Sequence, residues 1–348
     1  MIDYIIVGCG IGGISFIETC IENGKSVVVF DNDSQKSSKI AAGLYNPVIL
    51  KRFSALKDAQ LQIDLLNIFY ANIEQKLQVK FDFKLPILRK FFSIEEQNNW
   101  FSASDKPNLS PFLSLDLIKT KFKNINAPFD YGEILQTGYI DTEVFLSSYK
   151  KYLKSLSVYF NEPFDYQELK NSNDIISYKN LVAKNIVFAE GFGLKNNPYF
   201  NELPLDGTKG ELFIIKCLTL NLNAVINTSI YIVPLGNSFF KIGATYNWDD
   251  KSDMPTSDGK EELLTKIKAI LDCNFEIIEH LAAVRPTVKD RKPLIGTHPN
   301  YKNIHILNGL GTRGVMLAPQ MAQYLFNHIE NGIPLDKDID IKRYLKNL

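Results

Sequence analysis

The 348-residue sequence has few cysteines and no excess of charge of either sign. Its four cysteines, Cys9, Cys20, Cys217 and Cys273, form no C-x-x-C pair and match no spacing of a zinc site or disulfide framework. We therefore expect reduced, mostly buried thiols and no metal. Thirty-nine basic residues balance 39 acidic ones, whereas a protein that grips a polyphosphate backbone normally carries a basic excess. Bulk charge gives no support for a nucleic-acid partner.

Long hydrophobic runs, internal repeats and low-complexity linkers are also absent. No stretch reaches the roughly 18 apolar residues that a membrane-spanning helix needs. The apolar start, residues 5–17, lacks a basic segment before it and contains four glycines, so it is not typical of a signal peptide. We expect a cytoplasmic protein, and the chain is long enough for two lobes.

The first 31 residues have the pattern strand, glycine turn, helix, strand. Residues 3–7 and 27–30 are short apolar runs typical of buried parallel strands. Ile14, Ile17 and Ile21 recur at helical spacing, and Gly24 stands where a helix often ends. Residues 58–77 also have a helical pattern, with Leu61, Leu65, Ile68 and Phe69 predicted to share one face. Further helices are predicted at 142–156, 261–271 and 315–329, and further strands near 158–160, 184–189, 231–233, 239–243 and 304–307.

These elements predict an α/β fold, α+β overall, in which a Rossmann-like domain is interwoven with a domain built on a mixed or antiparallel sheet. The segments assigned to the Rossmann-like, cofactor-binding domain are 1–80, 135–205 and 284–348. The segments assigned to the substrate domain are 81–134 and 206–283.

The first motif is a glycine turn between a strand and a helix. Gly8 allows the tight turn, Gly10 lets the backbone approach a pyrophosphate, and Gly13 lets the helix pack closely on the sheet. Asp31, about twenty residues on, is placed to accept a hydrogen bond from a ribose hydroxyl, and its charge disfavours NADP. FAD and NAD share this fingerprint.

Two further small-residue motifs favour a flavin. Ala41, Ala42 and Gly43 would let main chain lie against a flat ring. Near the C-terminus, a second glycine turn opens a helix, which suits the pyrimidine ring of a flavin because that ring gains negative charge on reduction. Its members are Gly309, Gly311, Thr312, Arg313 and Gly314.

Arg285 stands among apolar residues in a stretch that begins Ala-Val-Arg-Pro. A guanidinium in such surroundings needs a partner, and a carboxylate fits its geometry best. That carboxylate belongs either to a substrate or to a structural Asp or Glu. None of the four histidines, His280, His298, His305 and His328, has a spacing typical of catalysis or metal binding.

In order and separation, these four motifs resemble the FAD-dependent D-amino-acid oxidase superfamily. The superfamily includes glycine, sarcosine and D-amino-acid oxidases, and the flavin domain of the bifunctional enzyme that makes 5-methylaminomethyl-2-thiouridine in tRNA. The resemblance covers nearly the whole chain, including 203–210 and 231–245, but not 81–131. It implies that Arg285 binds a substrate carboxylate, that Tyr246 lines the substrate pocket, and that the C-terminal turn contacts the flavin. Phe164 and Gly191 are further expected cofactor contacts, and the absence of a cysteine after Cys273 implies non-covalent FAD.

The resemblance implies oxidation of the C–N bond of an amine or amino acid by hydride transfer to flavin N5, giving an imine that hydrolyses. The electron acceptor is O2 or unknown. The amino-acid sequence of the turn Gly309–Gly314 resembles the tRNA-modifying domain more than glycine oxidase. One alternative activity is therefore removal of a carboxymethyl group from a tRNA wobble-base amine. Another is a nucleotide-binding protein without catalysis.

Overall fold

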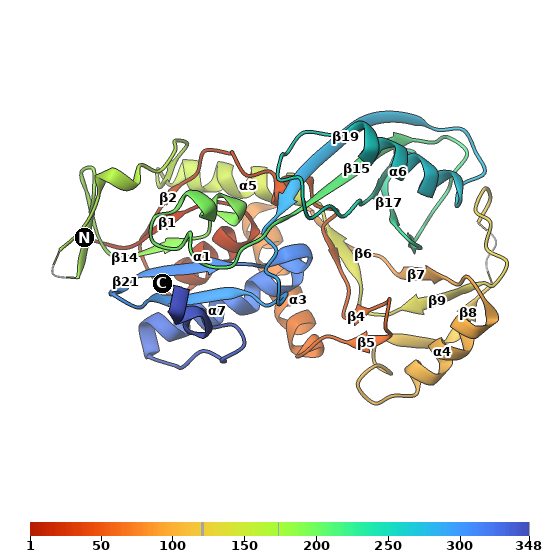
Figure 1. Cartoon of the computed structure of the whole chain (residues 1–348), viewed down its shortest axis with the longest axis horizontal. Coiled ribbons are helices and arrows are strands. Elements are labelled where there is room, and N and C mark those ends of the chain that lie inside the picture. Colours follow the sequence, from red (N-terminus) through yellow and green to blue (C-terminus); the bar gives the residue numbers. More distant parts are fainter. Residues whose placement is uncertain (120–121, 173, 348) are drawn as a thin grey trace.

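The structure, a computed structural model, describes residues 1–119, 122–172 and 174–347. Two eight-stranded sheets dominate it and lie toward opposite ends of the long axis (Figure 1). One carries the two chain termini, and the other carries α6 (Ser257–Lys268) and α4 (Ile94–Ser104). This mixed α/β architecture confirms the predicted fold class.

The first sheet has five parallel strands, in the order β11, β2, β1, β14, β21, with β11 at one edge. Antiparallel strands β12, β13 and β20 extend it. Central strands such as β1 are buried on both faces, as expected of a parallel sheet. The bounds are β1 Ile2–Val7, β2 Val27–Phe30, β11 Tyr159–Phe160, β12 Leu169–Ser172, β13 Ile175–Tyr178, β14 Leu181–Phe188, β20 Leu294–His298 and β21 Tyr301–Asn308.

Four helices cover one face of this sheet. Tyr4 and Ile6 of β1 join the hydrophobic core on that side, whereas Ile5 and Val7 join a separate core on the other. This alternation is the two-residue period of a strand. Helix α7 packs against both α1 and α3. The bounds are α1 Ile11–Glu22, α3 Ala59–Leu77, α5 Thr142–Ser155 and α7 Gly314–Asn331.

The second sheet has the order β19-β15-β18-β17-β16-β7-β9-β8. Helix α6 packs on one face through Leu263 and Ile267, which share a core with Phe213 and Ile215 of β15. The opposite residues of β15 face the first sheet across a cleft. The bounds are β7 Ile87–Lys90, β8 Leu113–Ile118, β9 Tyr131–Ile134, β15 Thr208–Lys216, β16 Val225–Asn227, β17 Tyr231–Gly236, β18 Phe239–Gly243 and β19 Glu276–Arg285.

Smaller elements connect the two sheets. Strand β10 pairs with β3 and β6, and β4 pairs with β5 in a short hairpin. The bounds are β3 Leu44–Tyr45, β4 Val48–Ile49, β5 Ser54–Ala55, β6 Asp82–Lys84, β10 Gly138–Ile140 and α2 Ser37–Ile40, with 3-10 turns at Tyr166–Glu168, Gly191–Asn196, Gly311–Arg313 and Ile341–Asn347. The domain boundaries given above stay a prediction; residues 120, 121, 173 and 348 lie outside the described part.

The predicted face of α3 is wrong in part. Phe69 is buried and Leu65 is partly buried, but Leu61 and Ile68 are 46% and 61% exposed, whereas Gln62 and Tyr70 are buried. Apolar residues occur on several sides of this helix, so its packing partner decides which side is buried. Tyr70 faces α7, where its hydroxyl donates to the Val315 carbonyl over 2.9 Å.

The expected absences concern cysteines, metals and membranes. All four cysteines are free, and three are buried, although the structure brings Cys217 Sγ within 3.4 Å of Cys273 Sγ. Among the described residues, no cluster of His, Cys, Asp or Glu could hold a metal ion. Within the same ranges, every helix is too short or too polar to cross a bilayer.

Candidate functional site: a cleft between the two sheets

The cleft lies where the five parallel strands end. Within four residues of those ends stand Phe164, Asp31, Gly8, Gly191 and Gly309, and all five line the cleft. Its volume of about 2600 Å³ exceeds the ~300–1,000 Å³ of ordinary small-molecule pockets. It therefore has room for a dinucleotide and a substrate together.

The turn after β1 requires glycine for steric reasons. Gly8 has φ +101°, and a Cβ there would lie 2.5 Å from the carbonyl oxygen of Ala189. A Cβ on Gly13 would lie 2.0 Å from the carbonyl oxygen of Gly8. Gly13 is buried behind the turn rather than lining the cleft, which is the packing role predicted for it.

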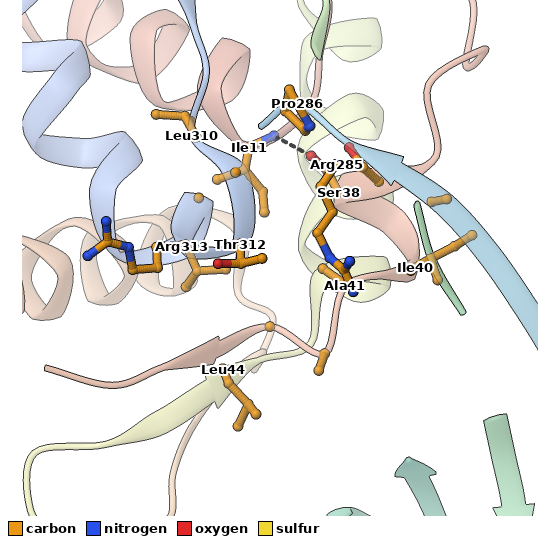
Figure 2. Close-up of a pocket in the computed structure, with 18 of the residues that line it drawn as sticks. Ile11, Ser38, Ile40, Ala41, Leu44, Arg285, Pro286, Leu310, Thr312 and Arg313 are labelled. Carbon is orange, nitrogen blue, oxygen red and sulfur yellow. Dashed lines mark hydrogen bonds between the residues drawn. The ribbon is translucent and has the colours of Figure 1, made fainter. Parts of the chain in front are cut away.

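The N-terminus of α1 opens toward the cleft. Its N-cap, Gly10, has no side chain to cap the first turn, and Gly10, Ile11 and Gly12 all line the cleft. The Ile11 N–H donates to Ser38 Oγ over 3.3 Å, the interaction drawn in Figure 2. Free backbone N–H groups and the positive end of the helix dipole form a site for a phosphate. Sequence reasoning missed Ser38. The feature that could have revealed it is the serine pair Ser37-Ser38, shortly before the small residues Ala41–Gly43.

Asp31 follows β2 and faces the cleft. Its Oδ2 lies 2.6 Å from Lys150 Nζ of α5 and 3.3 Å from the Tyr159 hydroxyl. Both contacts use the same oxygen, so among the described residues Oδ1 carries no hydrogen bond. Asp31 is thus held in one orientation with an oxygen left for a ribose hydroxyl.

Phe164 and Gly191 lie at the same end of the cleft as Asp31. Phe164 stacks on Tyr178 with ring centroids 4.2 Å apart and contacts Phe30 edge-on. The carbonyl of Gly191 accepts a 2.9 Å hydrogen bond from Asn308 Nδ2, which links the ends of β14 and β21. The aromatic cluster is a flat apolar surface of the kind an adenine ring needs.

Glu190, between Ala189 and Gly191, is a titratable group that sequence reasoning did not single out. It lines the cleft, and its carboxylate accepts hydrogen bonds from the Tyr166 hydroxyl and, over 2.7 Å, from Asn197 Nδ2. Burial raises the pKa of Glu190 to about 7, although the two hydrogen bonds oppose this. In the sequence, Glu190 is marked as an acidic residue that directly follows the apolar residues 186–189.

Ala41, Ala42 and Gly43 line the cleft between the two sheets. Gly43 has φ +70°, and a Cβ there would lie 1.9 Å from the Ile140 carbonyl oxygen. Lys241 Nζ donates to the Ala41 carbonyl over 3.0 Å, and burial lowers the pKa of Lys241. Sequence reasoning missed Lys241, a lone cation in the apolar run of β18.

The C-terminal turn meets the first glycine turn. A Cβ on Gly12 would lie 3.2 Å from Leu310 Cδ1, so the segments following β1 and β21 are in contact. Gly309, Gly311, Thr312, Arg313 and Gly314 all line the cleft. In Figure 2, Thr312 lies toward Ala41, whereas the Arg313 side chain extends away from Arg285 and Ala41.

Arg285 ends β19 and projects into the cleft (Figure 2). Its guanidinium lies over Gly210 of β15, where a Cβ would be 1.9 Å from Nη2. Nη1 and Nη2 reach only backbone carbonyls, those of Lys209 and Thr245, at 3.4 Å. Within the described chain no carboxylate pairs with it, and burial lowers its pKa. The alternative that a structural Asp or Glu pairs with Arg285 is thus not found among the described residues. Sequence reasoning also missed Gly210, whose lack of a side chain leaves room for the guanidinium.

Tyr246 lies beside Arg285 at the mouth of the cleft. The Arg285 Cζ is 5.3 Å from the centre of the Tyr246 ring, a cation–π contact. Tyr246 is 43% exposed and also lines the cleft. The structure therefore gathers all the predicted site residues around one cleft, with Gly13 behind it.

Comparison with protein families gives one match over most of the chain. The model of the FAD dependent oxidoreductase family, DAO, matches residues 3–327. A glycine oxidase of Bacillus subtilis (strain 168) is 26% identical over 251 residues, covering 66% of this chain and 68% of that protein. A tRNA 5-methylaminomethyl-2-thiouridine biosynthesis bifunctional protein of Idiomarina loihiensis is 25% identical over 167 residues, covering 45% of this chain but only 27% of that protein.

Solved structures share the fold. Glycine oxidase from Geobacillus kaustophilus superposes with a TM-score of 0.77 over 99% of this chain and 97% of that chain, at 16% sequence identity. The site fits the FAD on which the family depends, because Gly8, Gly10 and Gly43 line the cleft and no side chain caps the N-terminus of α1 or of α7.

Glu190 predicts a pH dependence of stability for the apoprotein. A carboxyl pKa raised from 4.5 to about 7 favours the folded state below pH 4.5, and this contribution is lost as pH rises through 7. At pH 8 the ionised Glu190 carboxylate lowers the free energy of unfolding by at most about 3 kcal/mol, since one pKa unit corresponds to ~1.4 kcal/mol. Glu190→Gln should therefore raise Tm more at pH 8 than at pH 5, as measured by thermal unfolding without FAD. Glu202→Gln, at an exposed position, is the control; equal shifts at both pH values would contradict the assignment.

Proposed function

The chain belongs to the DAO family of FAD-dependent oxidoreductases, and on that premise we propose that it oxidises the C–N bond of an amine carrying a carboxylate. A glycine or N-substituted glycine is the simplest such substrate. Bound FAD would accept the hydride from the carbon next to nitrogen, and the resulting imine is hydrolysed by water. The observation that carries this proposal is Arg285, a partly buried residue whose guanidinium lies in the cleft without a carboxylate partner among the described side chains.

Arg285 is suited to hold the substrate carboxylate. Its planar fork can donate two parallel hydrogen bonds, which fixes the orientation of the carboxylate as well as its position. The carbonyls of Lys209 and Thr245 lie at 3.4 Å, longer than the ~2.9 Å of a good N–H···O bond. A carboxylate would therefore replace weak contacts with strong ones.

The surroundings of Arg285 provide the rest of the pocket. Leu212, Ala283 and Leu281 present an apolar wall on neighbouring strands β15 and β19, and Tyr246 covers the arginine. An apolar wall excludes water and strengthens the ion pair between carboxylate and guanidinium. The α-carbon of the substrate would then be held near the segment Ala41–Gly43.

Two helix N-termini are placed to bind negative charge on FAD. The first turn of α1 serves the pyrophosphate, and the N-terminus of α7, at Gly314, serves the ring. We assign Gly8, Gly10, Asp31, Phe164 and Gly191 to the nucleotide half of a non-covalent FAD. The segments Ala41–Gly43 and Gly309–Gly314 are assigned to its ring.

Acid–base catalysis has little part in this proposal. None of the four histidines lines the described cleft. The amine would be oxidised in its neutral form, so the protein's main task is placement of the reacting atoms at roughly 3–3.5 Å. O2 is the electron acceptor we propose to test first.

The carboxylate assignment is tested with Arg285→Ala. We expect kcat/KM for glycine or sarcosine to fall by about 10²-fold or more, because a charge-assisted pair contributes several kcal/mol in a buried site, while FAD content stays unchanged. Arg285→Lys keeps the charge but loses the fork and should recover only part of the loss. Reduction of the flavin under anaerobic conditions is the measurement. An alanine variant that turns over normally would remove the assignment.

A specific observation also supports the tRNA-modifying alternative as a second candidate. Lys51 and Arg52, in the link between β4 and β5, and Lys106, after α4, line the mouth of the cleft and are exposed. Phe92, which is 51% exposed, lines the same cleft. Exposed cations and an exposed aromatic ring on one cleft suit phosphates and an unstacked base. A carboxymethylaminomethyl base would present to Arg285 the same carboxylate and secondary amine.

The second candidate is tested by gel shift with bulk tRNA. If RNA binds at this mouth, replacing Lys51, Arg52 and Lys106 by Ala should weaken binding about tenfold or more at low salt and lower its salt dependence. Replacing Lys260, Lys266 and Lys268 of α6, which removes the same charge outside the cleft lining, is the matched control. No shift of tRNA by the wild-type protein, or equal loss in both triple variants, would eliminate this candidate.

A further inference from the structure

Residues 245–256, called the strap below, follow β18 and carry Tyr246 over Arg285. The strap begins by pairing with β15. Lys209 N donates to the Asn247 carbonyl over 2.9 Å, and Asn247 N donates back to the Lys209 carbonyl over 3.0 Å. Thr245 N donates to the Glu211 carbonyl over 3.0 Å. Backbone hydrogen bonds to β15 therefore hold the two residues that flank Tyr246, Thr245 and Asn247.

The Lys209 side chain holds the middle of the strap, between Asp250 and Met254. Its ammonium group, 1% exposed, donates to Asp250 Oδ2 at 2.5 Å, to Ser252 Oγ at 3.1 Å and to the Met254 carbonyl. An ammonium has three protons, and all three are directed to the strap. Lys209 is not among the residues that line the cleft, so it has no access to a ligand there.

The same residue contacts Arg285 through its backbone. The Lys209 carbonyl lies 3.4 Å from Arg285 Nη1, and the carbonyl of Thr245, the first strap residue, lies 3.4 Å from both Nη1 and Nη2. The Tyr246 ring then stacks on the guanidinium. Arg285 is thus held between β15 and the strap. Lys209 joins β15 to the middle of the strap, whereas Glu211 joins it to the two ends, at Thr245 and Thr256.

We infer that Lys209, with Asp250 as its partner, is a positioning residue that orients Tyr246 and Arg285 for carboxylate binding. The inference rests on the role proposed above for Arg285. Lys209 touches neither substrate nor cofactor in this account. Removing its charge releases the strap, and Arg285 then loses the ring and the carbonyl that hold its fork in place.

A buried ion pair also affects stability, so the test needs readouts that stability alone does not change. Lys209→Met keeps the length of the side chain and removes the ammonium. Asp250→Asn removes the charge from the partly exposed partner, whose side chain is 32% exposed, and is the variant less liable to misfold. Lys266→Met, which breaks an exposed pair with Glu262 on α6, is the matched control.

The first readout is carboxylate affinity of the FAD-loaded protein. Acetate and benzoate, which have no amine to oxidise, are titrated while the visible absorption of the flavin is followed. We expect Kd to rise about tenfold or more in Lys209→Met and several-fold in Asp250→Asn, with FAD content unchanged. The double variant should be no worse than Lys209→Met, because both changes break one interaction. Lys266→Met should bind like wild type.

The second readout is tryptophan fluorescence, which needs neither FAD nor turnover. The chain has two tryptophans. Trp100 is fully buried, whereas Trp248 is on the strap, edge-on to Tyr246 with ring centroids 5.6 Å apart. Acrylamide quenching therefore reports mainly on the strap. We expect stronger quenching in Lys209→Met and Asp250→Asn than in wild type and Lys266→Met.

The outcomes separate this inference from the proposed function. Folded Lys209 and Asp250 variants with wild-type carboxylate affinity and wild-type quenching would overturn the positioning role; if Lys209→Met does not fold, Asp250→Asn decides. Arg285→Ala that binds acetate as tightly as wild type would instead contradict the proposed function.

Discussion

Five parallel strands that end at one edge of a sheet are the constraint on which the site depends. Their order, β11-β2-β1-β14-β21, draws on residues 2 to 308 of the chain, yet parallel pairing forces the segments that follow them to meet. Each of those segments supplies a residue to the cleft. The glycine at position 8 follows from this crowding, because a Cβ there would meet the Ala189 carbonyl in the segment after β14. Gly13 is required within the same turn, where a Cβ would meet the carbonyl oxygen of Gly8. The dinucleotide site is thus a consequence of topology rather than of any one motif.

The second sheet contributes a different property, a partly buried positive charge, that of Arg285, without a negative partner in the described chain. A guanidinium is costly to bury unless it is hydrogen-bonded, and Arg285 has only long contacts to two carbonyls. Gly210 makes this arrangement possible, since any side chain there would occupy the space of the guanidinium. Stability alone would favour pairing Arg285 with a protein carboxylate. Leaving it unpaired makes sense when a ligand supplies the carboxylate.

The sequence predicted the parts of this structure that depend on local backbone geometry. The glycine turns, the strands that precede them and the helices they open follow from spacing and burial pattern, and so does the mixed α/β class. Features that depend on tertiary contact were not predictable. Leu61 and Ile68 of α3 are as apolar as Ile63 and Leu66, and the packing of α3 against α7, α5 and β6 decides which pair is buried. Four residues that sequence reasoning missed act through partners 7 to 75 positions away in the sequence, for which spacing gives no signal. They are Ser38, Glu190, Gly210 and Lys209. The resemblance to a known family supplied the roles of Arg285 and Tyr246, which the residues alone left open.

The account as a whole requires one FAD to contact the segments after all five parallel strands while Arg285 holds a carboxylate beside its ring. A crystal structure of the protein with FAD and acetate tests this most directly. We expect the pyrophosphate at the N-terminus of α1, the ring between Ala41–Gly43 and Gly309–Gly314, and both acetate oxygens on the Arg285 guanidinium. Acetate bound elsewhere, with Arg285 contacting protein alone, or a flavin ring outside these two segments, would contradict it.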